Sequence, residues 1–296
     1  MRLLIGTALV LAFSCGLSEA GLTEDVAETD LESSELSSTK DTFILMVKRD
    51  DRRCVWPMCG GFFVRDLNST MQDRYVSGLD FSGSTLSEAD QERARVAPGA
   101  ELLVYGRLGP REARFGTRPL LVKNVYLGLP NVPFATTDSF YSMGLSRIAC
   151  VTTPCANLAA TRLNRTTGHV MATEVNVARA LKPLVPGDWV MERVRTGRAV
   201  VAGRIVRSGS DVVVDVSQVF IQLADRTQSC PRIAPPQCGS GQISAWEHTA
   251  NRCNVPVGCT PPGACARFTP ACEAGYLPTS WVNICPRFAC EPEWTQ

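Results

Sequence analysis

Apolar and polar residues alternate along much of the chain, which is the pattern of half-buried β-strands. Runs of this kind predict strands at residues 42–48, 62–67, 75–81, 102–108 and 120–127. Before the fourth run, Thr85-Leu86-Ser87-Glu88 offers a helix-capping box, and residues 89–95 suit a short helix closed by Pro98-Gly99. The first part of the chain is therefore predicted to be mainly β with one short helix.

The pattern then recurs at a spacing of 96 residues. The frame Cys-Val-x-x-x-Cys occurs at Cys54 to Cys59 and again at Cys150 to Cys155. Two copies of one domain are the natural interpretation. In the second copy Pro183 argues against a helix of any length, and residues 189–194 and 200–206 are predicted to be strands instead.

Near the end of each copy, residues 122–127 parallel residues 216–221, and in both the apolar positions change parity across two polar residues. One inserted residue would do this, so we predict a β-bulge in each copy. The order strand, strand, strand, helix, strand, strand is that of a small closed barrel of the OB type. We therefore predict a mainly β protein with two tandem homologous small β-barrel (OB-like) domains. A β-sandwich or a single combined sheet is the competing layout.

The two ends of the chain differ in composition from the repeat. Residues 1–20 carry Arg2, an apolar run and a small-residue end, which predicts a signal peptide. Cleavage after Ala20 would release a secreted protein, which we favour, whereas cleavage before Cys15 would make a lipoprotein. The predicted domains are the signal peptide at 1–20, a disordered acidic leader at 21–41, β-domain repeats at 42–134 and 135–228, and a Cys-rich C-terminal module at 229–296.

The cysteines indicate disulfides. Of 13 cysteines, Cys15 lies in the signal, and the other twelve can pair in an oxidising compartment. These are Cys54, Cys59, Cys150, Cys155, Cys230, Cys238, Cys253, Cys259, Cys265, Cys272, Cys285 and Cys290. No Cys-x-x-Cys spacing occurs and the chain has two histidines, so we predict no metal site and no cofactor. The last eight should staple a loop-dominated C-terminal module, with a pairing that the sequence leaves open.

Three residues in the repeats are candidates for function. A Cys54–Cys59 bridge would pin a connection between strands, and it would also present Trp56 on a rigid loop, where a preorganised aromatic side chain could contact a partner. Asn68 and Asn164 each begin an N-glycosylation motif. Because both lie at the same point of the repeat, a turn that needs a left-handed Asn explains them equally well, and we favour the turn.

The sequence gives little support for catalysis. It has no Gly-x-Ser-x-Gly elbow, no His-Glu-x-x-His and no Gly-Lys-Ser/Thr phosphate loop, so we predict no catalytic residues and a non-enzymatic binding protein. A secreted hydrolase using carboxylates is one alternative. Basic and acidic residues are interleaved, as at residues 48–53, which argues against a nucleic-acid partner. We expect an unknown protein or glycan outside the cytoplasm as partner, and membrane contact only through a lipid on Cys15.

Two resemblances add to this interpretation. The stretch from Arg53 to Val64, with Cys54, Cys59 and Gly60-Gly61, resembles a bacterial domain of unknown function whose proteins are predicted to be secreted or lipid-anchored and carry a Cys-rich C-terminal end. It covers residues 42–228, the ending 285–292 is similar to that family's tail, and it implies export and disulfides but no activity. Residues 272–290 are similar to the last part of antistasin-type protease inhibitors, with Phe288 where those have a cysteine. Protease inhibition through the tail is therefore a second alternative.

Overall fold

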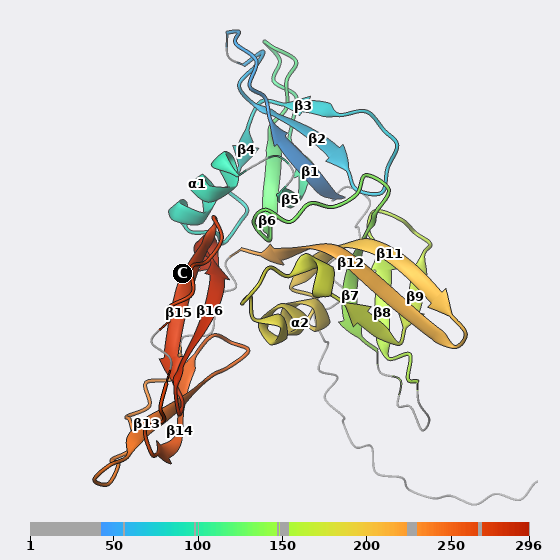
Figure 1. The fold of residues 1–296 in the computed structure, drawn as a ribbon. Coiled ribbons are helices and arrows are strands. Elements are labelled where there is room, and N and C mark those ends of the chain that lie inside the picture. Colours follow the sequence, from blue (N-terminus) through green and yellow to red (C-terminus); the bar gives the residue numbers. More distant parts are fainter. Residues whose placement is uncertain are drawn as a thin grey trace, which may run out of the picture. The chain divides into compact units, whose positions relative to one another are not determined.

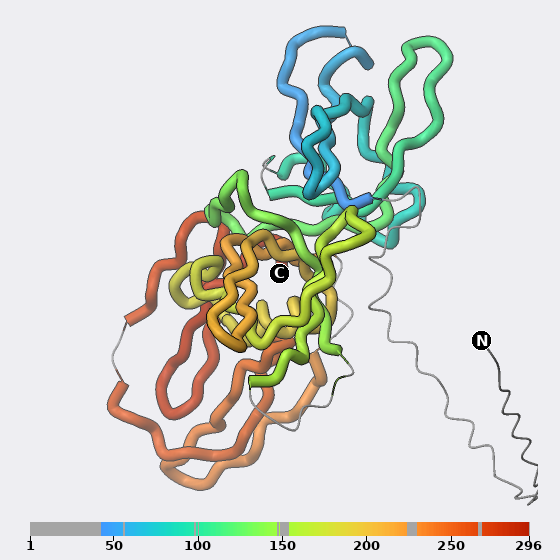
Figure 2. The backbone as a smooth tube through the Cα atoms, turned by 90° about the vertical axis from the view of Figure 1, so that its right-hand side faces the viewer, coloured from blue at the N-terminus to red at the C-terminus, as the bar shows by residue number. Residues whose placement is uncertain are grey.

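The computed structural model describes residues 43–55, 57–97, 99, 101–146, 148, 154–223, 230–265 and 268–295. The predicted signal peptide and acidic leader, Trp56 and Cys150 lie outside the described residues. Strands predominate in the described chain, as predicted, and Figure 2 follows its course from the first strand to the last. The domain boundaries drawn from the sequence stay predictions.

The first half of the chain, residues 43–128, combines one helix with six strands (Figure 1). Its elements are β1 (Phe43–Arg49), β2 (Phe62–Asp66), β3 (Arg74–Val76), β4 (Leu79–Asp80), α1 (Glu88–Val96), β5 (Leu102–Leu108) and β6 (Leu120–Gly128). The strands pair in the order β3-β2-β1-β5-β6, and the short β4 runs parallel to β6.

The second half, residues 139–222, has the same order of strands and α-helix and the same pairing, with one additional 3-10 helix, η2. Its elements are β7 (Ser139–Leu145), β8 (Leu158–Arg162), β9 (His169–Ala172), β10 (Glu174–Asn176), η2 (Ala178–Ala180), α2 (Gly187–Arg195), β11 (Ala199–Ser208) and β12 (Asp211–Gln222). Here the order is β9-β8-β7-β11-β12, and β10 runs parallel to β12. Each strand of the first half therefore has an equivalent in the second.

The helices differ from the sequence prediction in where they begin. Ser87 is the N-cap of α1, since its Oγ accepts the N–H of Asp90 at 3.2 Å, so the cap lies two residues beyond the predicted Thr85. The predicted strand at residues 189–194 is wrong, because these residues belong to α2. Pro183 does not interfere, because α2 begins only after Pro186, and proline is tolerated at a helix start.

The expectation of closed barrels is also wrong. The strands of both halves form one open 12-stranded sheet, which is the single combined sheet that the sequence left as a competing layout. The predicted strand at residues 75–81 is broken after Val76, and its two short pieces pair with different neighbours, β3 with β2 and β4 with β6. Among the described residues no single strand of this segment pairs with both neighbours, so the sheet of the first half is not closed by one continuous strand, and β6 pairs with β12 of the other half as well.

Both predicted β-bulges are present. The strand register shifts at Lys123 in β6 and at Ser217 in β12, and each of these is the extra, unpaired residue of its strand. Across from each bulge lies a glycine, Gly106 or Gly203, and a Cβ at either position would lie 2.3 Å from a carbonyl oxygen of the facing strand. The close approach of two backbones therefore requires glycine at the same point of both halves.

The two halves meet through equivalent surfaces. Leu127 of β6 faces Ile221 of β12, its own equivalent. The buried core on this side consists of equivalent pairs: Ile44 with Phe140, Leu67 with Leu163, Leu103 with Val200, Tyr105 with Ala202, and Tyr126 with Phe220. In a twofold-symmetric dimer, a surface of one subunit contacts the same surface of the other subunit. The halves are thus arranged like two subunits of a symmetric dimer within one chain.

The C-terminal module, residues 230–295, contains two β-hairpins and is less dominated by loops than predicted. They are β13 (Ile243–His248) with β14 (Asn254–Thr260) and β15 (Tyr276–Val282) with β16 (Pro286–Pro292), followed by η3 (Glu293–Thr295). The four disulfides are Cys230–Cys253, Cys238–Cys259, Cys265–Cys285 and Cys272–Cys290. The prediction that this module is rich in disulfides is confirmed.

Candidate functional site

A disulfide closes a short loop between β1 and β2 of the first half. Cys54 and Cys59 are bonded, and within the loop Met58 N–H donates to the carbonyl of Val55 at 3.0 Å. We call residues 54–59 the clamped loop. Val55 is 81% and Met58 61% exposed, so the loop offers two apolar side chains to solvent. Trp56, the predicted partner contact, belongs to this loop but lies outside the described residues.

A buried carboxylate holds the base of the clamped loop. The side chain of Asp50 is 1% exposed, and its two oxygens accept hydrogen bonds from Nε and Nη2 of Arg52 at 2.8 and 2.9 Å. The same carboxylate accepts the backbone N–H of Arg52 at 3.1 Å. The hydrogen bonds from Arg52 hold the pKa of Asp50 below its usual value. A bidentate pair of this kind fixes the orientation of both groups.

Two aromatic side chains complete this support. The Arg52 guanidinium lies 5.0 Å from the ring centroid of Phe63 and 5.6 Å from that of Tyr75. The Tyr75 hydroxyl donates to the carbonyl of Pro57 at 2.9 Å and so reaches the loop itself. We call Asp50, Arg52, Phe63 and Tyr75 the anchor. Asp50 and Arg52 follow the end of β1, Phe63 lies in β2 and Tyr75 lies in β3, so the loop is held from three sides of the sheet edge.

The second half shows which of these contacts the fold itself requires. The hydrogen bond from Asp50 N–H to the carbonyl of Gly61, at 2.9 Å, has its equivalent from Ser146 N–H to Asn157 at 2.8 Å. The Ser146 hydroxyl also accepts the N–H of Ile148 at 3.3 Å, as the Asp50 carboxylate accepts the N–H two residues after it. The backbone frame at the base of the loop is therefore common to both halves.

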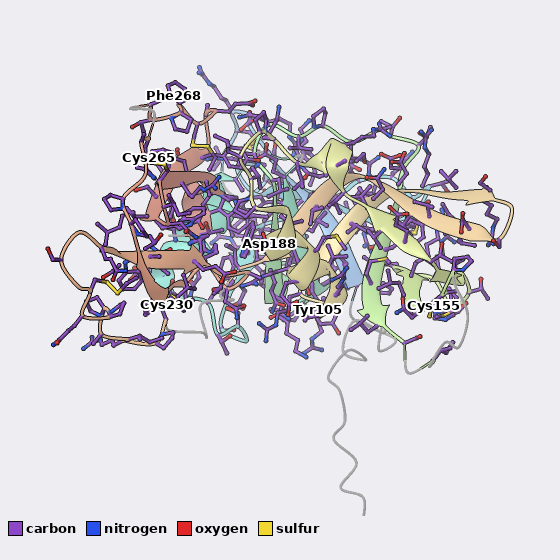
Figure 3. The ribbon with its side chains drawn as sticks, turned by 60° about the horizontal axis from the view of Figure 1, so that its bottom comes forward. Tyr105, Cys155, Asp188, Cys230, Cys265 and Phe268 are labelled. Atoms are coloured by element: carbon purple, nitrogen blue, oxygen red, sulfur yellow. A yellow bond between two sulfur atoms is a disulfide. The ribbon has the colours of Figure 1, made fainter. Side chains whose placement is uncertain are left out.

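The anchor itself is not common to both halves. The second half has Ser146, Ile148, Ala159 and Met171 at the equivalent positions, so it has neither the ion pair nor the rings. Cys155, labelled in Figure 3, is disulfide-bonded, while Cys150 lies outside the described residues. Since the second half keeps the frame without the anchor, the anchor serves the clamped loop rather than the fold.

The sequence analysis missed the anchor, although a signal for it was present. It used residues 48–53 only as an example of interleaved basic and acidic residues, whereas Asp50 is buried and paired. The repeat alignment places Ser146 opposite Asp50 and Ile148 opposite Arg52, so acid and base are replaced together. A joint replacement of this kind in a repeat points to an ion pair present in one copy.

The two glycosylation motifs lie at turns, as the sequence favoured. Asn68 and Asn164 have φ of 56° and 54°, the left-handed region. The Asn68 amide donates to the carbonyl of Phe140 at 2.8 Å and accepts its N–H at 2.8 Å. Asn164 does the same with Ile44, at 2.6 and 3.0 Å. Each asparagine thus binds the backbone of the opposite half, and its side-chain amide is occupied.

A cleft of about 690 Å³ lies beside the segment that connects the halves. Three carboxylates line it: Asp66, Glu101 and Asp138. Asp66 pairs with an arginine at 2.6 Å, Asp138 accepts a serine hydroxyl at 2.6 Å, and Glu101, whose pKa burial raises, accepts a backbone N–H at 3.3 Å. Each of these three described carboxylates has a partner, whereas the hydrolase alternative needs an unpaired cluster.

Within the described ranges, no group of three or more His, Cys, Asp or Glu side chains is placed to hold a metal ion. No helix among the same residues is long and apolar enough to cross a membrane. The absence of a cofactor stays a prediction from the sequence.

The sequence is similar to a domain of unknown function and to an uncharacterised protein. Residues 43–181 match the model of a domain of unknown function, DUF6748. An uncharacterised protein of Dictyostelium discoideum is 26% identical over 270 residues, which cover 87% of this chain and 90% of that protein. No solved structure matches the chain. The resemblance to a domain of unknown function is thus supported, whereas a bacterial source and a duplicated Cys-x4-Cys family domain have no support from these matches.

Proposed function

We propose that this protein is a non-enzymatic binding protein that acts outside the cytoplasm and contacts a protein partner through the clamped loop. The disulfides are typical of extracellular or exported proteins. A signal peptide at residues 1–20 would deliver the chain to that compartment, and this part of the proposal rests on the sequence alone.

The observation that carries the proposal is the anchor. The bidentate pair of the buried Asp50 carboxylate with Arg52, together with two rings, supports a loop that exposes Val55 and Met58, and the equivalent positions of the second half lack these side chains. Binding costs less free energy when the contacting loop is already ordered, because little conformational entropy is lost. Exposed apolar side chains on such a loop would fill an apolar pocket on the partner, with Trp56 as a further contact.

The test compares two matched pairs of exposed apolar residues. Full-length protein would be used to capture partners from the extracellular fraction of its own host, with quantitative mass spectrometry as readout. In one variant Val55→Ser and Met58→Ser are combined. In the control Leu145→Ser and Ile148→Ser are combined, which removes two exposed apolar side chains from the second half.

We expect one partner to be retained by the control and lost by the loop variant, because only the clamped loop is held in the binding geometry. Trp56→Ala should weaken capture of the same partner. Equal capture by wild type, control and loop variant would refute the assignment of the loop. A substrate turned over by the purified protein would refute the non-enzymatic function itself.

A further inference from the structure

The C-terminal module consists of two hairpin units that no described disulfide connects. The first unit, residues 230–260, holds Cys230–Cys253 and Cys238–Cys259, and the second, residues 265–292, holds Cys265–Cys285 and Cys272–Cys290. Figure 3 labels Cys230 in one unit and Cys265 in the other. Their hairpins also form separate two-stranded sheets. Side-chain contacts therefore hold the two units together.

Those contacts centre on His248, at the end of β13. Its imidazole is 3% exposed, and Nε2 lies 3.0 Å from Oε1 of Glu291 on β16, whose side chain is 5% exposed. On its other side Nδ1 lies 2.8 Å from Oδ1 of Asn254. The ring stacks on Trp281 of β15 at a centroid distance of 4.7 Å. Oxygen acceptors at both ring nitrogens fit the doubly protonated imidazolium, which donates from both.

The surroundings of this pair carry one further charge in direct contact. Arg252, in the turn between β13 and β14, lies with Nη1 3.4 Å from Oε2 of Glu291, and Thr279 donates to the same oxygen at 3.1 Å. From α2, Arg193 donates to the carbonyl of Ala250 at 3.3 Å, and the charges that act on His248 are those of Glu291 and Arg252. The titratable groups that face His248 are therefore Glu291 and Arg252.

We propose that the His248–Glu291 pair is a pH-responsive joint that fixes the two hairpin units to each other in mildly acidic medium and loosens as the medium becomes alkaline. The pair is buried, it bridges two units that have separate sheets and separate disulfides, and it includes the one histidine of the module. Because imidazole changes charge near neutral pH, the joint would respond within the range that extracellular and organellar fluids span.

The direction of the response follows from the two pKa shifts. The hydrogen bond to Glu291 raises the pKa of His248 above 6.5, so its contribution is complete below pH 6.5 and is lost as pH rises through the raised value. Burial opposes ionisation of Glu291, but hydrogen bonds and the charges of His248 and Arg252 lower its pKa below 4.5. Its contribution is complete above pH 4.5 and is lost as pH falls through the lowered value. The joint is therefore tightest between these two limits.

The first test is an NMR titration of the ring signals of the two histidines in the full chain. The variant His169→Gln assigns the signals, because His169 is exposed at the start of β9 and far from this module in sequence. We expect His248 to titrate with a midpoint above 6.5. A midpoint at or below that value would overturn the proposal without any variant of the joint.

The second test measures amide hydrogen exchange in β13 and β16 at about pH 6 and about pH 9, corrected for intrinsic exchange rates. In wild type and His169→Gln the opening equilibrium should rise at the higher pH, by about tenfold for each unit of elevation of the pKa. His248→Gln keeps a polar side chain but cannot titrate, so its opening should be independent of pH. The same pH dependence in His248→Gln as in wild type would overturn the proposal. If that variant does not fold, the wild-type titration decides.

Discussion

The bases of the two loops that follow β1 and β7 share a backbone frame but differ in the side chains around it. Both begin with the same main-chain hydrogen bond, at 2.9 Å in the first half and 2.8 Å in the second. The first has the carboxylate–guanidinium pair and the two rings, whereas the equivalent positions of the second are Ser146, Ile148, Ala159 and Met171. Because one chain contains both versions, the comparison separates what the fold needs from what one loop has in addition. In the first half the addition is a set of side-chain contacts that reach a loop with Val55 and Met58 exposed.

The largest effect on stability is expected from the glycine that faces the β-bulge in each half. Gly106→Ala and Gly203→Ala each place a Cβ about 2.3 Å from a carbonyl oxygen of the facing strand, so the strands must separate at the bulge. We expect each to lower the free energy of unfolding by about 3 kcal/mol. Urea unfolding at pH 7 measures this. Gly144→Ala is the matched control, because nothing lies within 4 Å of the added methyl group.

A large difference between the two glycine variants would break the equivalence of the halves. Similar losses, with Gly144→Ala within about 1 kcal/mol of wild type, would support it.

A smaller effect is expected where each half binds the backbone of the other. Asn68→Ala removes the amide partner of Phe140 and Leu163, and Asn164→Ala removes that of Ile44 and Leu67. Each substitution also puts alanine at positive φ. We expect each to cost about 2 kcal/mol in the free energy of unfolding. Asn251→Ala, at an exposed position, is the control. A free energy of unfolding equal to that of wild type in either variant would show that the hydrogen bonds of that asparagine to the opposite half do not stabilise the protein.

The smallest expected effect is a response to acid pH in the clamped loop that the second half does not show. Because Arg52 lowers the pKa of Asp50 below 3.8, the anchor should be complete above pH 3.8 and lost only as pH falls through the lowered value. Amide signals of the clamped loop, followed by NMR from pH 6 downward, should broaden or exchange faster in that acid range. The amide of Ser146 in the second half should not change, since no titrating carboxylate replaces Asp50 there. Parallel changes at both sites would contradict the account.

Alternation of apolar and polar residues was enough to predict most strands, and the change of parity at Lys123 and Ser217 was enough to predict the bulges. The alternation could not predict whether the strands close into a barrel. Whether β3 and β4 continue as one strand depends on which neighbours they pair with across the sheet, and that is a long-range property. The helix at residues 187–195 was missed because Pro183 was weighed as if it lay inside the helix.

The candidate site was predicted only in part. Cysteine spacing located the clamped loop, because a bridge between Cys54 and Cys59 needs no tertiary information. The anchor depends on burial of Asp50 and on rings from β2 and β3, which only the folded chain brings together. The same holds for His248 and Glu291, which are 43 residues apart in sequence.

The central claim is that the anchor orders the loop and is not needed for the fold. The most direct test converts the first half to the residues of the second, by combining Asp50→Ser with Arg52→Ile in the full chain. Both the midpoint of urea unfolding and amide hydrogen exchange would be measured. We predict an unchanged midpoint and a loss of amide protection in residues 54–61 of about tenfold or more. A lowered midpoint, or protection that stays as in wild type, would contradict the claim.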